Sequence, residues 1–204
     1  MIGYASRTGT KRNLAELKKH GWRLIVSARG AWRNECFKYG IDNGAWTSFQ
    51  KGEPFDVDAF AGLVKKMGAG ADWIVAPDIV MGGMESLEKS VSWLPILEGI
   101  APILIPVQNG MTAEDLRPLV GPSVGIFVGG DTEWKESSMP IWGRLKRETG
   151  CYLHVGRVNT RRRILLCHLA GADSFDGTSG SRYAKTIEPL SAAISQQTLF
   201  KEIL

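Results

Sequence analysis

The chain has 204 residues, of which 44% are hydrophobic and 23% are charged, and its formal net charge at pH 7 is +4. This length supports one hydrophobic core, and no apolar run is long enough to cross a bilayer, so we expect a single domain over residues 1–204 and no membrane partner. The small positive excess fits a polyanionic partner and fits an ordinary surface equally well, and only its distribution distinguishes the two.

The start of the chain and its cysteines bear on the cellular compartment. The segment MIGYASRTGTKRNL lacks the basic end and apolar stretch of a secretion signal. The three cysteines, Cys36, Cys151 and Cys167, lie far apart and have neither the spacing of a disulfide framework nor that of a four-ligand zinc site. We therefore expect a cytoplasmic protein, in the host cytoplasm if the chain is viral, that binds no metal.

Apolar runs rich in β-branched residues alternate with polar loops and amphipathic segments along the whole chain. They predict eight strands, at roughly residues 1–6, 23–29, 39–46, 73–80, 102–108, 125–130, 151–157 and 172–179. Helical periodicity is clearest over 13–21, 56–68, 84–99 and 160–171. Continuously apolar strands that alternate with helices favour parallel pairing. The predicted fold class is therefore α/β, a compact (β/α)8 TIM barrel near the lower size limit of about 200 residues.

Local signals refine this outline. Thr112, followed by Asp115 three residues later, predicts a capped helix start. The stretch GAWRNECFK, residues 30–38, is shorter than the roughly dozen residues of a parallel crossover, so we expect one short irregular βα unit with a loop there. Six glycines are predicted to end helical segments before the next strand: Gly21, Gly68, Gly99, Gly121, Gly150 and Gly171.

Polar or glycine positions end six of the predicted strands. They are Asp42, Asp78, Gln108, Gly129 with Gly130, His154 and Asp176. Each has an ordinary interpretation when taken alone: a turn for the aspartates and glycines, a bond to a neighbouring loop for Gln108, and a satisfied interior position for the histidine. A parallel barrel, however, gathers its strand ends into one mouth, where three carboxylates would repel one another. A purely structural role does not explain that cost, so the set predicts an active site.

Basic residues cluster where this mouth would lie. Arg157, Arg161, Arg162 and Arg163 follow the seventh predicted strand, in a region that commonly binds phosphate in this fold. A solvated helix face is the alternative for one or two of them. The same rim would receive Arg7, Lys11, Arg12, Lys135 and Arg182. We expect a backbone of phosphates to lie across this rim.

Six motifs now stand in a specific order: IDNGAW, VAPDIV, PVQNG, FVGG, YLHVG and SFDGTSGSR. Together they resemble the tRNA-guanine transglycosylase superfamily, and most closely its compact DpdA-type DNA 7-deazaguanine transglycosylases from phages and bacteria. The resemblance spans nearly the whole predicted barrel. The tRNA enzymes of this family carry a Cys-rich zinc-binding subdomain after the barrel. This sequence ends at Leu204 without one, which favours DNA as the substrate.

The resemblance implies a chemistry and an assignment of roles. Asp176 would be the nucleophile that forms a covalent glycosyl-aspartate, and Asp42 would be the acid/base. Asp78 would accept hydrogen bonds from guanine N1 and its exocyclic amine, while Gln108 and the amide of Gly130 would serve O6. Gly129 and Asn43 belong to the same pocket, and Trp46 and His154 would sandwich the ring. Asn43, Trp46 and His154 stand where the family usually has serine, tyrosine and methionine.

The expected reaction is exchange of guanine in DNA for a 7-deazaguanine such as preQ0, with no cofactor. The partners would then be DNA, alternatively tRNA, and the free base. Relatives often form homodimers, although the sequence leaves the oligomeric state open. Three other functions stay compatible with the sequence: a queuine-type tRNA-guanine transglycosylase, a noncatalytic nucleic-acid-binding barrel, and a phosphate-binding metabolic barrel supported by the loop arginines alone.

Overall fold

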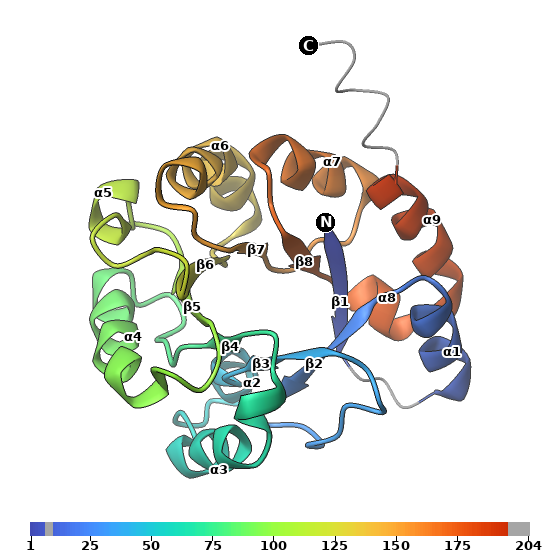
Figure 1. The fold of residues 1–204 in the computed structure, drawn as a ribbon, viewed down its shortest axis with the longest axis horizontal. Coiled ribbons are helices and arrows are strands. Elements are labelled where there is room, and N and C mark those ends of the chain that lie inside the picture. Colours follow the sequence, from blue (N-terminus) through green and yellow to red (C-terminus); the bar gives the residue numbers. More distant parts are fainter. Residues whose placement is uncertain (7–9, 196–204) are drawn as a thin grey trace.

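The computed structural model describes residues 1–6 and 10–195. Eight parallel strands close into a barrel in chain order, with the first strand bonded to the last, and helices form a ring outside it (Figure 1). The predicted TIM barrel is therefore confirmed. The strands are β1 (Ile2–Ser6), β2 (Arg23–Ser27), β3 (Tyr39–Asp42), β4 (Ile74–Val75), β5 (Ile103–Val107), β6 (Val124–Val128), β7 (Leu153–Val155) and β8 (Ser174–Asp176).

All four predicted helices are present, and others join them. Residues 28–38, all of them described, form turns without a helix, as the short irregular unit predicted. The longest of the described helices, α6, was predicted only through its Gly150 stop, and its span was not among the periodic segments. The described helices are α1 (Lys11–Lys19), α2 (Ala45–Gln50), α3 (Val57–Met67), the 3-10 turn η1 (Gly68–Gly70), α4 (Met84–Leu97), α5 (Ala113–Leu116), α6 (Thr132–Thr149), α7 (Arg161–Ala170), α8 (Thr178–Arg182) and α9 (Ala184–Ser195).

Side-chain caps explain where several helices begin. Thr112 and Asp115 form the predicted capping box, in which each side chain accepts a bond from the other residue's backbone amide. Four further helices begin with a side chain that accepts from the amide three residues later; these caps are Thr10, Asp56, Asp131 and Thr160.

The predicted glycine stops are correct in part. Gly150 and Gly171 end α6 and α7 in the left-handed conformation, and Gly21 and Gly99 also have positive φ. Two predictions are wrong. Gly68 stays right-handed because the chain continues into η1, and Gly121 pairs with Val124 in an isolated bridge.

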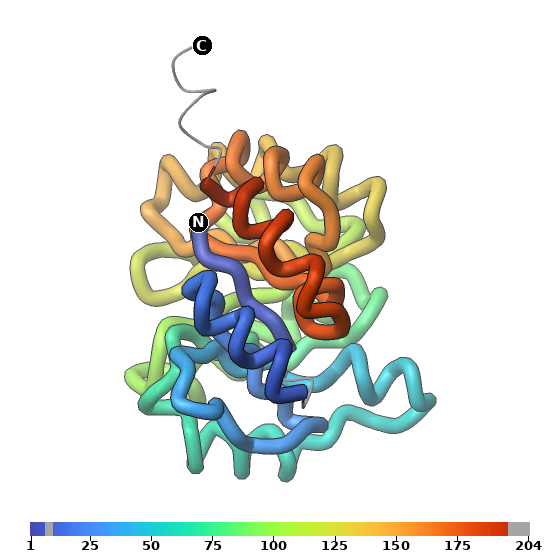
Figure 2. The backbone as a smooth tube through the Cα atoms, turned by 90° about the vertical axis from the view of Figure 1, so that its right-hand side faces the viewer, coloured from blue at the N-terminus to red at the C-terminus, as the bar shows by residue number. Residues whose placement is uncertain are grey.

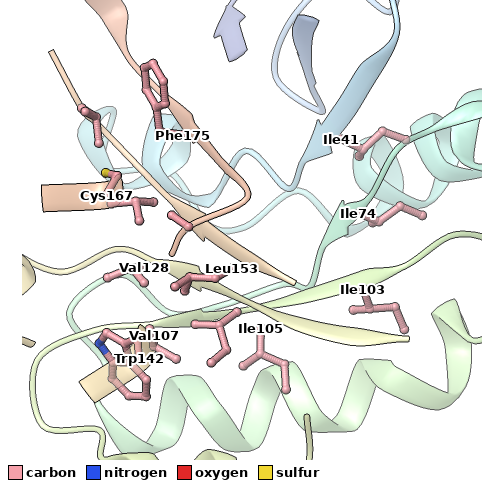
Figure 3. Close-up of a cluster of buried hydrophobic side chains, with 14 of the residues drawn as sticks. Ile41, Ile74, Ile103, Ile105, Val107, Val128, Trp142, Leu153, Cys167 and Phe175 are labelled. Carbon is pink, nitrogen blue, oxygen red and sulfur yellow. The ribbon is translucent and has the colours of Figure 1, made fainter. Parts of the chain in front are cut away.

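Strand alternation divides the buried side chains into two layers. Ile103, Ile105 and Val107 of β5 point outward into the large core between strands and helices, part of which Figure 3 shows, whereas Leu104 points into the barrel. The barrel interior also holds Tyr4 and Trp73, whose rings lie 5.0 Å apart. These rings fill the barrel beneath its mouth.

Polar residues close the opposite end of the barrel. Arg23, at the start of β2, forms an ion pair of 2.9 Å with Asp72, just before β4, and the Tyr4 hydroxyl donates to Asp72 at 3.0 Å. Figure 2 shows α1 and α9 side by side over β1, where they cover the closure between the first and last strands. Among the helices of residues 10–195, none combines the length and apolarity that a membrane span requires.

The packing of α6 on α7 gives a first testable prediction. A Cβ at Gly143 would lie 2.3 Å from the Ala170 carbonyl oxygen, so Gly143→Ala must push the two helices apart. We expect a loss of about 1–3 kcal/mol in the free energy of unfolding, measured with urea. Gly121→Ala is the control, because a Cβ there meets no atom within 4 Å. Equal effects of both substitutions would contradict this account of the packing.

Candidate active site

The structure brings the predicted strand-end residues to one mouth. Asp42 is the last residue of β3 and Asp176 the last of β8, while Asp78 follows β4 in the loop before α4. Burial raises the pKa of Asp42, and the negative charges of Asp176 and Asp78 raise it further, so Asp42 lies within electrostatic range of both other carboxylates. The convergence of these carboxylates is thus a property of the fold.

Asp176 is held by a chain of buried hydrogen bonds. The Nε2 atom of His154 lies 3.1 Å from Asp176 Oδ2, and its Nδ1 atom lies 2.7 Å from the Ser174 hydroxyl. A carboxylate only accepts, so Nε2 carries a hydrogen and donates it to Asp176. The Ser174 hydroxyl can donate to Nδ1 or accept from it, which satisfies the ring in either protonation state. The backbone amide of Arg157 also donates to Asp176, over 3.3 Å to Oδ1.

The predicted role of His154 as one face of a base sandwich is wrong. The residue is fully buried inside the barrel, and its ring stacks on Phe127 with centroids 4.7 Å apart and planes at 23°. Its burial and its bond to Asp176, the last residue of β8, place the His154 ring below the mouth. His154 therefore supports Asp176 from beneath and presents no ring face to a ligand.

Lys135 also differs from its prediction as a phosphate contact on the rim. It is 2% exposed, and its Nζ donates to the Gly156 carbonyl oxygen over 2.5 Å. Burial, followed by the positive charge of Arg157, lowers the pKa of Lys135 to about 8, and the negative charge of Asp176 opposes that shift. The helix that carries Lys135 lies outside the strands. Its ammonium is therefore buried between this helix and the end of β7, next to the mouth.

Asp42 has a strongly perturbed carboxyl group. Burial is the main cause that raises its pKa from 3.8 to about 6, and the charges of Asp176 and Asp78 add to the shift. Hydrogen bonds from the Ser27 hydroxyl and from the Gly44 amide, the latter 3.2 Å from Oδ2, act in the opposite direction. Asp42 can therefore hold a proton near neutral pH more readily than an ordinary aspartate.

Asp78 is oriented by Asn43. The Asn43 carboxamide donates to Asp78 Oδ1 over 2.9 Å and to the Ala76 carbonyl over 2.7 Å, and its oxygen accepts from the Ala45 amide. Burial raises the pKa of Asp78, while the bond from Asn43 and the charge of Lys89 oppose the rise. Asn43 was predicted to bind the base directly. Because its carboxamide is already bonded on both sides and 4% exposed, it acts by positioning Asp78.

Gln108 and Gly129 are engaged elsewhere. The Gln108 carboxamide donates to the Ile79 carbonyl and accepts from the Met81 amide, both over 2.8 Å, which anchors the loop after β4. The Gly129 amide donates to the Val107 carbonyl over 2.8 Å within the barrel ladder. Their predicted direct contacts with a base are therefore corrected to structural roles, and the ordinary interpretation of Gln108 holds.

Trp46, Gly130 and Arg157 meet across the mouth. The Trp46 ring is 43% exposed and stacks on Phe49, and the Arg157 guanidinium lies over the Trp46 ring at 5.0 Å from its centroid. The same guanidinium donates to the Gly130 carbonyl. Arg157 was predicted to face phosphate on the rim, but in this structure its side chain spans the mouth.

The remaining predicted phosphate contacts divide into arginines that bind a carboxylate and cations with no ion pair to another described residue. Arg162 and Arg163 bind Glu136, over 2.5 Å and 2.9 Å, so a carboxylate offsets part of their charge. Three exposed cations stand in the first turns of α1 and α7, and a fourth is the last residue of α8; they are Lys11, Arg12, Arg161 and Arg182. The predicted contact of Arg7 lies outside the described residues.

Within residues 1–6 and 10–195, no group of three or more His, Cys, Asp or Glu side chains is placed to hold a metal ion. The three cysteines are free, with Cys36 exposed and the other two buried. Burial raises the pKa of the Cys167 thiol to about 12.

Sequence reasoning missed Ser174, although the alternation of β8 contains the signal. Ser174 and Asp176 are two residues apart and face the barrel, while Phe175 between them faces the helices. Ser174 also pairs in register with His154 of β7. A polar residue two positions before a predicted nucleophile on a buried strand is the pattern that could have identified it.

A scan against protein-family models finds no match for the chain, and a search of curated proteins finds no significant match. Solved structures match over nearly its full length. Malate synthase from Haloferax volcanii aligns with a TM-score of 0.60 at 12% identity, covering 96% of this chain and 74% of that one. Tryptophan synthase from M. tuberculosis aligns with a TM-score of 0.54 at 14% identity, covering 96% of this chain and 91% of that one. β-Methylaspartase from Clostridium tetanomorphum aligns with a TM-score of 0.55 at 11% identity, covering 98% of this chain and 58% of that one.

The chain shares the fold of these enzymes. At such low identity the likeness shows the fold alone, and none of the three is a transglycosylase. The resemblance based on strand-end motifs therefore stays a prediction. In a TIM barrel the catalytic groups come from the carboxyl ends of several strands, which is where Asp42, Asp78 and Asp176 are found.

The raised pKa of Asp42 predicts a pH-dependent stability. A carboxyl group whose pKa rises from 3.8 to about 6 on folding contributes stability below about pH 4, and this contribution is lost as the pH rises through 6. Asp42→Asn removes the charge, so at pH 8 the variant should be more stable than wild type by up to about 3 kcal/mol, and the difference should vanish near pH 3. Urea unfolding between pH 3 and 8 measures it.

Asp58→Asn is the control for this experiment. Asp58 is exposed in the first turn of α3, where a carboxylate interacts favourably with the helix dipole. Its removal should lower the stability at pH 8 by at most about 1 kcal/mol, opposite in sign to the effect at Asp42. A stability difference at Asp42 that does not change with pH would contradict the assignment.

The chain of bonds under Asp176 gives another prediction. Ser174→Ala removes the hydroxyl that satisfies His154 Nδ1 and leaves a buried nitrogen without a partner. We expect the free energy of unfolding to fall by about 1–3 kcal/mol. Ser92→Ala, which removes an exposed hydroxyl from α4, should change it by no more than about 0.5 kcal/mol. Similar effects of the two substitutions in urea unfolding would show that Ser174 does not support the histidine.

Proposed function

We propose that this protein exchanges guanine in DNA for a 7-deazaguanine base such as preQ0, through a covalent glycosyl-aspartate. The observation that carries the proposal is the contrast between two carboxylates of one mouth. Asp176 receives hydrogen bonds from His154 Nε2 and the Arg157 amide, which hold its carboxylate in one orientation, while burial raises the pKa of Asp42 to about 6. Enzymes of glycosyl transfer commonly use two carboxyl groups in different environments, one as the nucleophile and one as the acid/base.

The first half of the reaction breaks the bond between guanine and its sugar. Asp176 attacks C1′ of the target nucleotide, the C1′–N9 bond breaks, and its electron pair leaves with guanine. Asp42 supplies the proton that neutralises the departing base. Because Asp42 ionises near pH 6, a usable fraction is protonated around neutral pH, and the resulting carboxylate is ready to accept a proton later.

The second half restores the enzyme. The incoming 7-deazaguanine gives its N9 proton to Asp42, and N9 attacks C1′ as the ester bond to Asp176 breaks. Two displacements at C1′ retain the anomeric configuration. His154 and Ser174 keep the carboxylate of Asp176 in one orientation through both steps, because their bonds are buried beneath it.

Asp78 is the group that would select the base. Its carboxylate, oriented by Asn43, can accept from N1 and the exocyclic amine of guanine, which are both donors. The Gly130 amide is the remaining candidate donor for O6, since the Gln108 carboxamide anchors the loop after β4. The exposed Trp46 ring offers a stacking surface.

Two features of the mouth support a nucleic acid as the partner. Exposed cations at the starts of α1 and α7 and at the end of α8 can contact phosphates. Exposed apolar side chains, Trp46, Ile79 and Met81, follow β3 and β4 and can pack against bases. A guanine inside a duplex would have to flip out of the stack, at a cost of about a few kcal/mol that such contacts offset.

Base exchange on labelled nucleic acid tests the proposal. DNA and tRNA are incubated with the protein and preQ0, and their nucleosides are analysed by mass spectrometry. We expect a 7-deazaguanine nucleoside in DNA. Asp176→Ala should lose exchange and covalent trapping by about 10⁴-fold or more, because no other group forms the ester. Asp42→Asn should slow exchange by about 10²- to 10⁴-fold, and Asp58→Asn should leave it unchanged.

The outcomes separate the competing functions. Exchange in tRNA instead of DNA would overturn the assignment of DNA as the substrate and would leave the proposed reaction unchanged. Binding of nucleic acid without any product, with Asp176→Ala binding as wild type does, would identify a noncatalytic barrel. Undiminished exchange by Asp176→Ala would refute the assignment of the nucleophile.

A further inference from the structure

We propose that the guanidinium of Arg157 occupies the base-stacking position of the free protein, and that the guanine base of the substrate displaces it toward the substrate phosphate. This inference rests on the proposed function and concerns the same mouth. Arg157 would then compete with the base for the Trp46 ring in the free protein, and it would bind a phosphate of the nucleic acid once it is displaced.

The position of the side chain is the first argument. Trp46 follows β3 and Arg157 follows β7, and in a closed barrel of eight strands these two lie on opposite sides. The guanidinium nevertheless lies over the Trp46 ring, 5.0 Å from its centroid. The side chain therefore crosses the mouth at which Asp42, Asp78 and Asp176 lie.

The chemistry of the two groups is the second argument. Guanine contains the fragment N1–C2–N2, which is planar and carries N–H donors, as a guanidinium does. Both groups stack on an indole face, and both need acceptors at their edge. Arg157 meets each requirement here, because its guanidinium lies over Trp46 and donates to the Gly130 carbonyl. The contacts that hold the arginine are thus contacts that suit the base.

The backbone of Arg157 allows the side chain to move while its anchor stays in place. Its amide donates to Asp176 Oδ1, and its φ of +59° is unusual for a residue with a Cβ. The side chain is exposed, so its rotation toward solvent meets few neighbours. Asp176 is the proposed nucleophile at C1′, and the phosphates of the same nucleotide flank that sugar. A displaced Arg157 is therefore anchored within reach of a phosphate.

This arrangement distinguishes the two ligands of the site. A free base must compete with the guanidinium, which lowers its apparent affinity in proportion to the occupied fraction. A nucleotide in DNA brings a phosphate that binds the displaced arginine and offsets the loss of its contact with Trp46. Arg157 should therefore weaken binding of the free base and strengthen binding of DNA.

The test compares Arg157→Ala and Arg157→Lys with wild type. Calorimetry with preQ0 alone should show binding to Arg157→Ala that is about 5- to 30-fold tighter, the range expected from loss of a stacked cation and one hydrogen bond. Binding of a guanine-containing DNA oligonucleotide should become weaker, and the slope of log affinity against log salt should fall by about 1. Arg157→Lys keeps the charge without the planar fork, so it should bind preQ0 as the alanine variant does and keep the wild-type salt slope.

A second readout reports the contact itself in the absence of any purine. The emission of Trp46 is isolated as the difference between each protein and the same protein carrying Trp46→Phe. Arg157→Ala should change this emission, and preQ0 should change it in wild type in the same direction. An unchanged emission, or preQ0 binding that is no tighter in Arg157→Ala while wild type still exchanges bases, overturns this inference alone. If no variant binds preQ0 and wild type exchanges nothing, the proposed function fails and the inference fails with it.

Discussion

The closure of a parallel barrel forces three carboxylates into one partly dry mouth, and the arrangement of the site follows from how that charge is tolerated. Each aspartate ends or follows a strand, so none of them can move away from the others without changing the barrel. Unpaired buried charge is costly, and hydrogen bonds to the ionised form reduce the cost. Asp176 accepts a hydrogen bond from His154, Asp78 accepts one from Asn43, and Asp42 accepts bonds from Ser27 and Gly44. At Asp42 burial outweighs these bonds, and its pKa rises to about 6.

The support for these carboxylates is built into the strands themselves. His154 and Ser174 occupy neighbouring positions on β7 and β8, with Phe127 of β6 against the histidine ring. These side chains are inside the barrel because their neighbours in sequence, Leu153 and Phe175, face the helices. The same alternation that builds the outer core therefore fixes the orientation of Asp176. A change in the register of β8 by one residue would exchange its barrel-facing and helix-facing side chains. Both the outer core at β8 and the orientation of Asp176 would then be lost.

The sequence predicted the strands well because a buried parallel strand has a local signature. Eight apolar runs in regular alternation identify the barrel, and the loop over residues 30–38 follows from its length alone. Helical periodicity identified α1, α3, α4 and α7 and left out α2, α6, α8 and α9. α2 and α8 have six and five residues, too few to show a helical repeat, and α6 was indicated only by its Gly150 stop.

Within the site, the sequence placed residues at the mouth and could not say which atoms were free. Gln108 and Lys135 were assigned by chemical type as ligand contacts, and both make structural bonds, one to the loop after β4 and one to Gly156. The difference depends on which backbone groups of distant segments lie nearby, and no spacing in the sequence contains that information. His154 shows the same limit, since a strand position specifies a face of the sheet and does not specify depth in the barrel.

The charges of the mouth are arranged in two zones, and this constrains any polyanionic ligand. The carboxylates lie at the strand ends, while the exposed cations lie on the helices that follow, at the starts of α1 and α7 and at the end of α8. A phosphate placed among the carboxylates would be repelled, whereas a phosphate at the helix starts gains both cationic side chains and helix dipoles. A nucleotide satisfies both zones only with its base and sugar inward and its phosphates outward. Arg157 joins the zones, because its backbone bonds the inner carboxylate of Asp176 and its side chain carries a cation across the opening.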